Sequence, residues 1–156
     1  MQRLTPSQAR QKIKYYCAYQ ERSHREVKNK LYGFGLFKND VEEILSELIS
    51  EDYLNEERFA RQFAGSKFRV KQWGRNKIVY ALKKKMVSAY NIKIAMKEID
   101  EDEYEKTLLH LCRTKWNALK HEQHIVREVK TRNFLLQRGF EHPLIGNAIK
   151  EVRGKR

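Results

Sequence analysis

The side chains best suited to chemistry in this chain are the cations between Arg58 and Lys97. This segment of forty residues contains twelve Lys and Arg and neither Asp nor Glu, in a chain whose formal net charge is +13. Cations that are concentrated in one segment create a directed positive field, which attracts a polyanion or an acidic protein groove. The sequence therefore predicts an acidic binding partner for this segment.

Aromatic residues accompany the cations at the start of the segment. Phe59 and Phe63 are four residues apart, on one face of an expected helix, whereas Arg58, Arg61 and Arg69 fall on the opposite face. We expect the two rings to belong to the core. The segment offers these arginines no acid at the i,i+4 spacing, so we interpret them as a binding face, with an ordinary solvated face as the alternative.

Later in the segment, Trp73 precedes Gly74, and three lysines follow at positions 83–85. Cations at the end of a helix complement its dipole, so one or two of the lysines could serve that purpose, but three exceed it. A Trp beside a helix-breaking Gly most often packs in the corner between two helices. The less favoured alternative is that Trp73 stacks on a base.

Other groups of reactive side chains do not match a known kind of catalytic or metal site. Six carboxylates crowd the next helix boundary: Glu98, Asp100, Glu101, Asp102, Glu103 and Glu105. Acids are ordinary capping residues there, and a calcium loop would need a central glycine. The nitrogen and sulfur ligands His110, Cys112, His121 and His124 lack the usual zinc spacing. Without a phosphate-binding glycine loop or a nucleophile elbow either, the sequence predicts no enzyme activity, no metal and no cofactor.

The elements that position these residues are expected to be helices. Apolar residues recur at spacings of three and four, and the chain has only two prolines, Pro6 and Pro143, each near a predicted helix start. Predicted capping residues are Thr5, Ser23, either Asn39 or Asp40, Asn55, Ser88 and Asp102. Gly74 and Gly139 are expected where helices stop or turn. Together these features predict an all-α fold with about nine helices.

The apolar pattern repeats along the chain at offsets of 51 and then 53 residues. Leu31, Leu82 and Leu135 then align, as do four further sets of apolar residues. We predict three tandem three-helix repeats over residues 5–54, 55–100 and 101–153, the second of them basic. Such repeats bury their apolar faces partly against one another and form an elongated, curved body. Chance self-similarity between amphipathic helices is the alternative.

Composition sets the remaining expectations. The chain has 156 residues and is 40% hydrophobic, which suits a packed core. Its longest strongly apolar run, residues 31–37, is much shorter than the roughly 20 residues of a membrane helix, and the N-terminus does not resemble a signal peptide. We therefore expect a cytoplasmic protein, monomeric and without membrane contact. Cys17 and Cys112 are too far apart for a redox pair and are interpreted as packing residues.

The basic segment also carries a family resemblance. Between Tyr53 and Ser88 the chain contains the steps Tyr53-Leu54, Arg58-Phe59-Ala60, Trp73-Gly74-Arg75 and Ala81-Leu82. With these steps it resembles the signature of the RecX family of recombinase regulators. Arg22-Ser23, with Glu26 and Leu31, resembles the first repeat of that family, and Arg138-Gly139-Phe140 resembles the third. The resemblance extends over nearly the whole chain.

Three positions depart from the family pattern. Relatives commonly have glycine where this chain has Asp52 and Met86, so we expect both turns to be made in another way. Glu56 stands where many relatives have Asp, which keeps the negative charge near a helix start. These departures affect the expected turn geometry rather than the family resemblance.

The resemblance implies a non-enzymatic regulator in DNA repair, recombination and the SOS response. Such a regulator binds the RecA recombinase filament on DNA and generally inhibits its ATPase, strand-exchange and coprotease activities. From charge, we expect the contacts with recombinase or DNA phosphates to be made by ten residues: Arg58, Arg61, Lys67, Arg69, Lys71, Arg75, Lys77, Lys83, Lys84 and Lys85. The alternative is a general nucleic-acid-binding protein that contacts phosphates without sequence preference.

Overall fold

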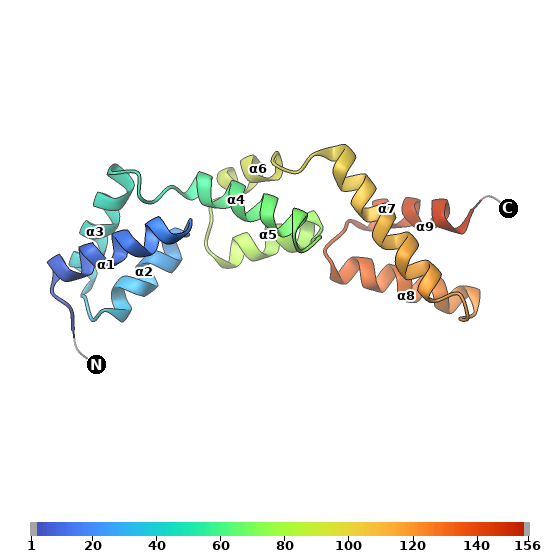
Figure 1. The fold of residues 1–156 in the computed structure, drawn as a ribbon, viewed down its shortest axis with the longest axis horizontal. Coiled ribbons are helices and arrows are strands. Elements are labelled where there is room, and N and C mark those ends of the chain that lie inside the picture. Colours follow the sequence, from blue (N-terminus) through green and yellow to red (C-terminus); the bar gives the residue numbers. More distant parts are fainter. Residues whose placement is uncertain (1–2, 155–156) are drawn as a thin grey trace. The chain divides into compact units, whose positions relative to one another are not determined.

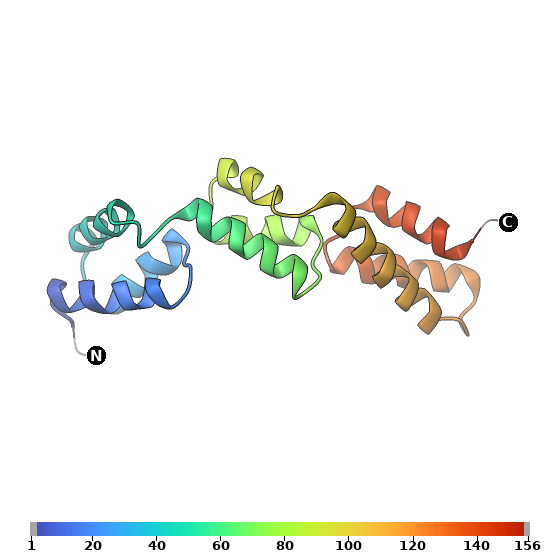
Figure 2. The ribbon, with the colours of Figure 1, turned by 45° about the horizontal axis from the view of Figure 1, so that its top comes forward.

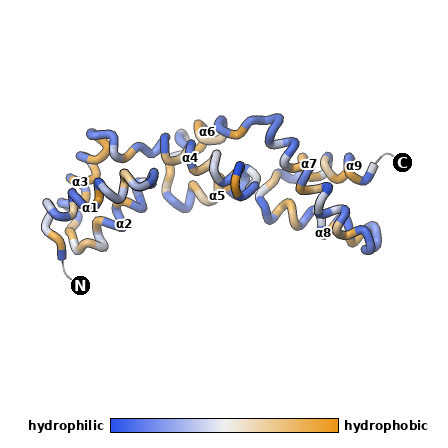
Figure 3. The backbone as a smooth tube through the Cα atoms, viewed as in Figure 1, coloured by the Kyte–Doolittle hydropathy of each residue, from blue (hydrophilic) through white to orange (hydrophobic). Residues whose placement is uncertain are grey.

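The computed structural model describes residues 3–154, which form nine α-helices and no strand (Figure 1). The helices are α1 (Pro6–Tyr19), α2 (His24–Gly33), α3 (Lys38–Ser50), α4 (Glu56–Arg69), α5 (Arg75–Lys84), α6 (Ala89–Met96), α7 (Glu101–Ala118), α8 (His124–Gln137) and α9 (His142–Arg153). The predicted all-α fold is confirmed. Along the helices, hydrophobic and hydrophilic residues succeed one another in short patches, as amphipathic helices require (Figure 3).

Local capping explains where several helices begin. The Thr5 hydroxyl accepts the Gln8 N–H, and the Gln8 side chain accepts the Thr5 N–H, in a complete capping box. Ser23, Asn55 and Ser88 each accept an N–H three residues further on, as predicted. The prediction of Asn39 or Asp40 was wrong, because α3 begins at Lys38 after Phe37, which makes no side-chain capping hydrogen bond. The prediction of Asp102 was also wrong. Asp100 caps α7, since its carboxylate accepts the Glu103 N–H at 3.0 Å.

The same left-handed turn ends the second, fifth and eighth helices. Gly35, Met86 and Gly139 follow α2, α5 and α8 with φ angles of 88°, 63° and 97°, and they lie 51 and 53 residues apart. The residues after these three turns, Leu36, Val87 and Phe140, are all buried. Leu31, Leu82 and Leu135, which aligned in the sequence, are buried as well. Backbone conformation and burial thus follow one repeating pattern.

The expectation that Asp52 and Met86 make their turns in another way was wrong. Asp52 also has a φ of 63°, so both residues adopt the left-handed conformation that glycine adopts most readily. The Val87 N–H donates to the Leu82 carbonyl, and the Met86 N–H donates to the Lys83 carbonyl, closing the end of α5. The geometry of the turn persists without the glycine.

We expect Met86→Gly to raise the free energy of unfolding by about 1 kcal/mol. A non-glycine residue in the left-handed region is strained by roughly 1–2 kcal/mol, part of which the greater freedom of glycine in the unfolded chain offsets. The Met86 side chain is 71% exposed, so its removal sacrifices little burial. Urea denaturation measures the effect. Met86→Ala is the control, since it removes the same side chain but keeps the Cβ; equal midpoints for the two variants would contradict the explanation.

By packing, the chain divides into two compact units. Unit 1 comprises residues 1–63 and 82–95, and unit 2 comprises residues 64–81 and 96–156. The boundaries therefore fall inside α4, inside α5 and before the last residue of α6. The predicted division into three repeats at residues 54 and 100 stays a prediction.

Each unit contains a core made of helical apolar residues. In unit 1, α1, α2 and α3 contribute Ala9, Ile13, Val27, Leu31, Val41, Ile44 and Leu48. In unit 2, α7, α8 and α9 pack together (Figure 2). Tyr104 and Phe140 are fully buried there, with ring centroids 5.2 Å apart. Among the described residues, no helix combines the length and apolarity needed to cross a membrane.

Within unit 2, the residues before α5 approach the end of α8 backbone to backbone. The Gly74 N–H donates to the Arg138 carbonyl at 2.7 Å, and the Asn76 N–H donates to the Gly139 carbonyl at 2.9 Å. A Cβ on Gly74 would lie 2.4 Å from the Gly139 carbonyl, and one on Gly139 would lie 2.3 Å from the Lys77 Cβ. The two glycines predicted to end or turn helices therefore touch each other.

Cys17 and Cys112 are both buried and free, in agreement with their interpretation as packing residues. Burial raises the pKa of each thiol to about 11. Both therefore remain protonated near neutral pH, in the form that is a poor nucleophile.

Candidate functional site

The ten cations predicted to contact a partner divide between the two units. Arg58, Arg61 and the three lysines 83–85 belong to unit 1, whereas Lys67, Arg69, Lys71, Arg75 and Lys77 belong to unit 2. They come from α4, α5 and the residues that follow each of these helices.

Arg58 is committed to acids of its own unit. Its Nε donates to the Glu21 carboxylate at 2.6 Å, and its remaining nitrogens donate to the side chain and carbonyl of Asp52 at 3.2 and 3.1 Å. The hydrogen bond to Glu21 is the main reason why the pKa of Arg58 is raised. Arg58 thus ties the start of α4 to the residues that follow α1 and α3.

Arg61 and Lys85 also pair with acids. Arg61 donates to Glu57 at 2.9 Å, so the argument that no acid is available at the i,i+4 spacing was wrong for this residue, because Glu57 lies just before the acid-free segment. Lys85 Nζ lies 2.7 Å from Glu26 on α2. The rings of Phe59 and Phe63 are 6.0 and 5.8 Å from the same Nζ.

Phe59 is buried and Phe63 is half-buried, with their ring centroids 5.7 Å apart. The prediction that these rings belong to the core is confirmed for Phe59.

Glu56 has a larger structural role than its sequence position indicates. One carboxylate oxygen accepts the Ser88 N–H at 2.9 Å and the Asn91 amide at 3.0 Å, and the other lies 3.5 Å from His24 Nδ1. Burial alone would raise the pKa of Glu56, but the hydrogen bonds from Ser88 and Asn91 and the charge of His24 outweigh it and lower the pKa. Glu56 thus joins α4, α6 and α2.

Lys83 and Lys84 remain exposed in the last turn of α5. Arg25 of α2 donates to the Lys84 carbonyl at 2.8 Å, which fixes the backbone of this turn. The helix end therefore presents two cations to solvent from a backbone that is held in place.

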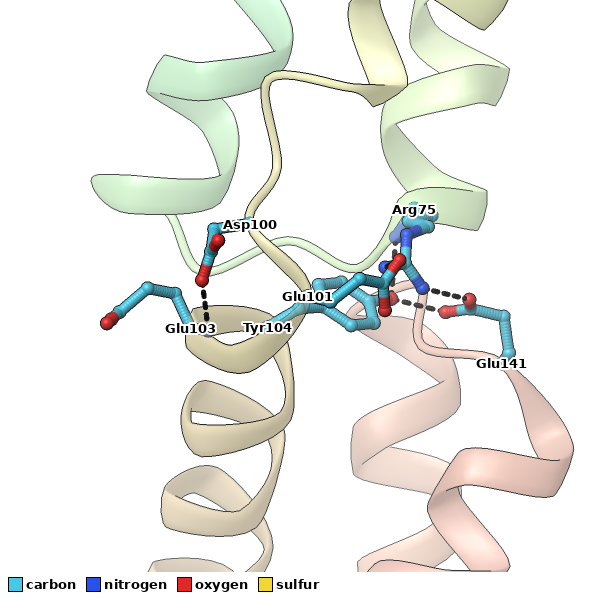
Figure 4. Close-up of polar contacts among 6 residues, drawn as sticks. All are labelled: Arg75, Asp100, Glu101, Glu103, Tyr104 and Glu141. Carbon is cyan, nitrogen blue, oxygen red and sulfur yellow. Dashed lines mark hydrogen bonds and ion pairs between the residues drawn. The ribbon is translucent and has the colours of Figure 1, made fainter.

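In unit 2, Arg75 lies at the centre of a network drawn from three elements (Figure 4). Its guanidinium donates to Glu141 at 2.9 Å and to Glu101 at 2.6 Å, and lies 3.8 Å from the centre of the Tyr104 ring. Its backbone N–H donates to the Tyr104 hydroxyl at 2.9 Å, and that hydroxyl donates to Glu141. Only 19% of the Arg75 side chain is exposed.

The network shifts the acid–base properties of its members. Burial would lower the pKa of Arg75, but its hydrogen bonds to Glu141 and Glu101 raise it overall. Burial, together with the hydrogen bond to Glu141, raises the pKa of Tyr104. Both residues therefore keep their protons, and the network holds the start of α5 against α7 and the residue before α9.

Trp73 lies half-buried among cations of the same unit. Lys67 Nζ and Lys77 Nζ are 5.0 and 4.6 Å from its ring centroid, within the range of a cation–π interaction. Arg138, which follows α8, donates to the Lys71 carbonyl at 3.0 Å. Trp73, Lys71, Lys77 and Arg138 line a shallow cleft of about 340 Å³, which agrees with the expected corner between helices.

The carboxylates near residue 100 serve the fold. Asp100 caps α7, Glu101 pairs with Arg75, and Glu103 lies in the acidic first turn of α7. Among residues 3–154, no group of three or more His, Cys, Asp or Glu is arranged to hold a metal ion.

Comparison with known proteins identifies similar sequences over most of the chain. Residues 55–96 match the family described as RecX, second three-helix domain. A regulatory protein RecX of Chlorobium limicola is 33% identical, over 84% of this chain and 82% of its own length. One of Prosthecochloris aestuarii is 30% identical over 88% of each chain. Another, of Clostridium perfringens strain 13, is 26% identical, and this chain spans only 62% of its length.

Solved structures share the fold. The crystal structure of RecX from Lactobacillus salivarius superposes with a TM-score of 0.86, at 22% identity, over 95% of this chain and 96% of that one. A crystal structure of a regulatory protein RecX gives a TM-score of 0.82 at 19% identity, over 91% of this chain and 71% of that one.

Proposed function

The chain belongs to the RecX family of regulatory proteins, which are not enzymes, and we propose that it binds the RecA recombinase filament on DNA and inhibits it. The proposed effect is a loss of ATPase, strand-exchange and coprotease activity, in the bacterial cytoplasm. The observation that carries the proposal is the acid-free segment, which holds twelve cations in the middle of a regulatory protein. Its field suits DNA phosphates, an acidic recombinase surface, or both.

The contacts within the chain suggest which of the ten candidate cations stabilise the fold and which contact the filament. Arg58, Arg75 and Lys85 form ion pairs with glutamates of their own unit, so we assign their charges mainly to the fold. Arg69, Lys71 and Lys83 are exposed. In the proposal these three make primary contacts with the filament, and Arg61, Lys67, Lys77 and Lys84 extend the same basic surfaces within their units.

The test measures the DNA-dependent ATPase activity of the cognate recombinase while the purified protein is added. We expect inhibition below one regulator per recombinase protomer. Replacing Arg69, Lys71 and Lys83 together by Gln should shift the inhibition curve to at least about tenfold higher concentration, since charged contacts at an interface are each worth about 1 kcal/mol or more. The matched control replaces Lys28, Lys106 and Lys150, three exposed lysines outside the segment.

Undiminished ATP hydrolysis at a saturating concentration of the unaltered protein would refute the proposed function. Binding to bare duplex DNA distinguishes the alternative of a general nucleic-acid-binding protein. In that case the triple variant should flatten the dependence of log K on log[salt] by up to about three units, because each phosphate contact contributes about 0.9. A normal salt slope combined with weak inhibition would assign the three cations to the recombinase.

A further inference from the structure

We propose that a groove between α1 and α2 binds single-stranded DNA by stacking bases on Tyr15 and Tyr19. This tyrosine groove comprises the two exposed rings with Tyr16, Arg22, Lys30 and Phe34; it is open to solvent and has a volume of about 710 Å³. It lies entirely in unit 1 and outside the acid-free segment. The choice of DNA over RNA rests on the proposed function, whereas binding to the groove requires no recombinase.

Two large aromatic rings of the groove face solvent without contributing to the core. Tyr15 and Tyr19 are 76% and 75% exposed. They are four residues apart on α1, so they project from the same face of the helix with their Cβ atoms roughly 6 Å apart. Two bases of an extended single strand can each stack on one of these rings. This is possible because an unstacked strand spaces its bases more widely than the roughly 3.4 Å between the stacked bases of a duplex.

The groove is also basic. The Arg22 guanidinium lies 3.6 Å from the centre of the Tyr16 ring and donates from Nε to the Tyr16 carbonyl at 3.1 Å. Lys30 Nζ lies 5.3 Å from the Tyr16 ring and 5.8 Å from the Phe34 ring. Lys12 adds a further cation to the lining, which includes no carboxylate.

Acids near the groove in the sequence are committed elsewhere. Glu21, which precedes Arg22, bonds to Arg58, and Glu26 of α2 bonds to Lys85. Neither carboxylate belongs to the lining of the groove. The charge of Lys12, Arg22 and Lys30 is therefore available to an anionic ligand.

The combination of exposed rings and cations favours a single strand over other occupants. A single strand presents both phosphates for the cations and unstacked base faces for the tyrosines. A duplex hides its base faces, and an amphipathic helix is usually received by aliphatic side chains rather than by three cations. Tyrosine is well suited to stacking because it combines a flat apolar face with a polar edge.

The experiment measures the fluorescence anisotropy of a fluorescein-labelled thymidine oligonucleotide with the purified protein and no recombinase. Removing an aromatic platform weakens single-strand binding by about 5- to 150-fold per base. We therefore expect Tyr15→Ala with Tyr19→Ala to raise the Kd by at least about tenfold. Replacement of both residues by Phe, which keeps the rings, should leave the Kd within about twofold of the original.

Tyr90→Ala is the matched control, since Tyr90 is a similarly exposed tyrosine on α6 and should be replaceable without effect. Replacing Lys12 and Lys30 by Gln should reduce the slope of log K against log[salt] by up to about 1.4, or 0.7 for each phosphate contact in a single strand. A folded double-alanine variant, checked by circular dichroism, that binds the oligonucleotide normally would overturn the proposal.

The recombinase assay separates the remaining outcomes. If the double-alanine variant binds the oligonucleotide normally but no longer inhibits the filament, the groove receives a protein and the proposal is wrong. If the original protein binds the oligonucleotide through the tyrosines while the filament ATPase is unaffected, the groove assignment stands and the proposed function fails. An equal Kd for the oligonucleotide in Tyr90→Ala and in the double-alanine variant would exclude a specific role for the groove.

Discussion

Replacing Gly139 by alanine is expected to destabilise unit 2 by about 3 kcal/mol or more. Gly139 has a φ of 97°, and a Cβ there would lie 2.3 Å from the Cβ and 2.5 Å from the N of Lys77. A strained backbone conformation costs about 1–3 kcal/mol, and overpacking costs about the same. Because the clash includes the backbone of α5, a change of side-chain rotamer cannot relieve it.

The chain offers a control for the substitution itself. Gly146 lies inside α9, and a Cβ there would meet nothing within 4 Å. Gly146→Ala should therefore stabilise the protein by about 0.5–1 kcal/mol, since alanine favours a helix interior. Urea denaturation followed by circular dichroism measures both variants. Equal midpoints for Gly139→Ala and the original protein would show that Gly139 does not lie this close to Lys77 of α5.

Gly74 tests the same approach from the other side. Its Cβ would lie 2.4 Å from the carbonyl carbon and oxygen of Gly139, so Gly74→Ala should also be strongly destabilising. The two substitutions separate the same pair of backbones. The double variant should therefore lose less stability than the sum of the losses in the two single variants. Simple additivity would indicate that each glycine is required for an unrelated reason.

The glycines show how far local sequence information extends. That Gly139 ends a helix could be predicted from its position after an apolar period, and its φ agrees. The contact with Gly74, 65 positions away, depends on tertiary packing that no local pattern encodes. The helices and caps such as Ser23 and Asn55 were predictable because they depend on local contacts. A cap and the N–H that it accepts are only three residues apart.

The candidate site shows the same limit in its electrostatics. Counted along the chain, the segment of twelve cations has no acid. In the fold, acids from outside the segment pair with its cations. Arg58 bonds to Glu21, 37 residues away in the sequence, and Arg75 bonds to Glu141, 66 residues away. Charge counting predicted a basic segment but could not tell which cations serve the fold. The tyrosine groove escaped the sequence analysis because it combines residues from α1 and α2.

Arg75→Ala should lower the free energy of unfolding of unit 2 by about 2–3 kcal/mol. Losing one partner of a buried ion pair costs about 3–5 kcal/mol, and the figure here is smaller because 19% of Arg75 and 26% of Glu141 remain exposed. The loss leaves Glu141 without its guanidinium partner and removes the cation from the face of Tyr104.

Two glutamates on the same arginine supply the control. Glu141 is 26% exposed and Glu101 is 77% exposed, so Glu141→Ala should be much more destabilising than Glu101→Ala, which should cost less than about 1 kcal/mol. A double-mutant cycle between Arg75 and each glutamate, measured by urea denaturation, isolates the two couplings. Equal couplings would contradict the difference that burial predicts.

Arg75 also decides between the two kinds of role that a cation in this segment can have. Arg75→Lys keeps the charge but cannot donate to Glu101 and Glu141 in the fixed geometry of a guanidinium. If Arg75 serves the fold, both Arg75→Ala and Arg75→Lys should lose stability, yet inhibit the recombinase normally at a temperature where they are folded. If instead it contacts the filament, the folded alanine variant should inhibit poorly and lysine should restore inhibition. We expect the first result, because Arg75 already makes both contacts within unit 2. Its guanidinium pairs with Glu141, and its backbone N–H donates to the Tyr104 hydroxyl.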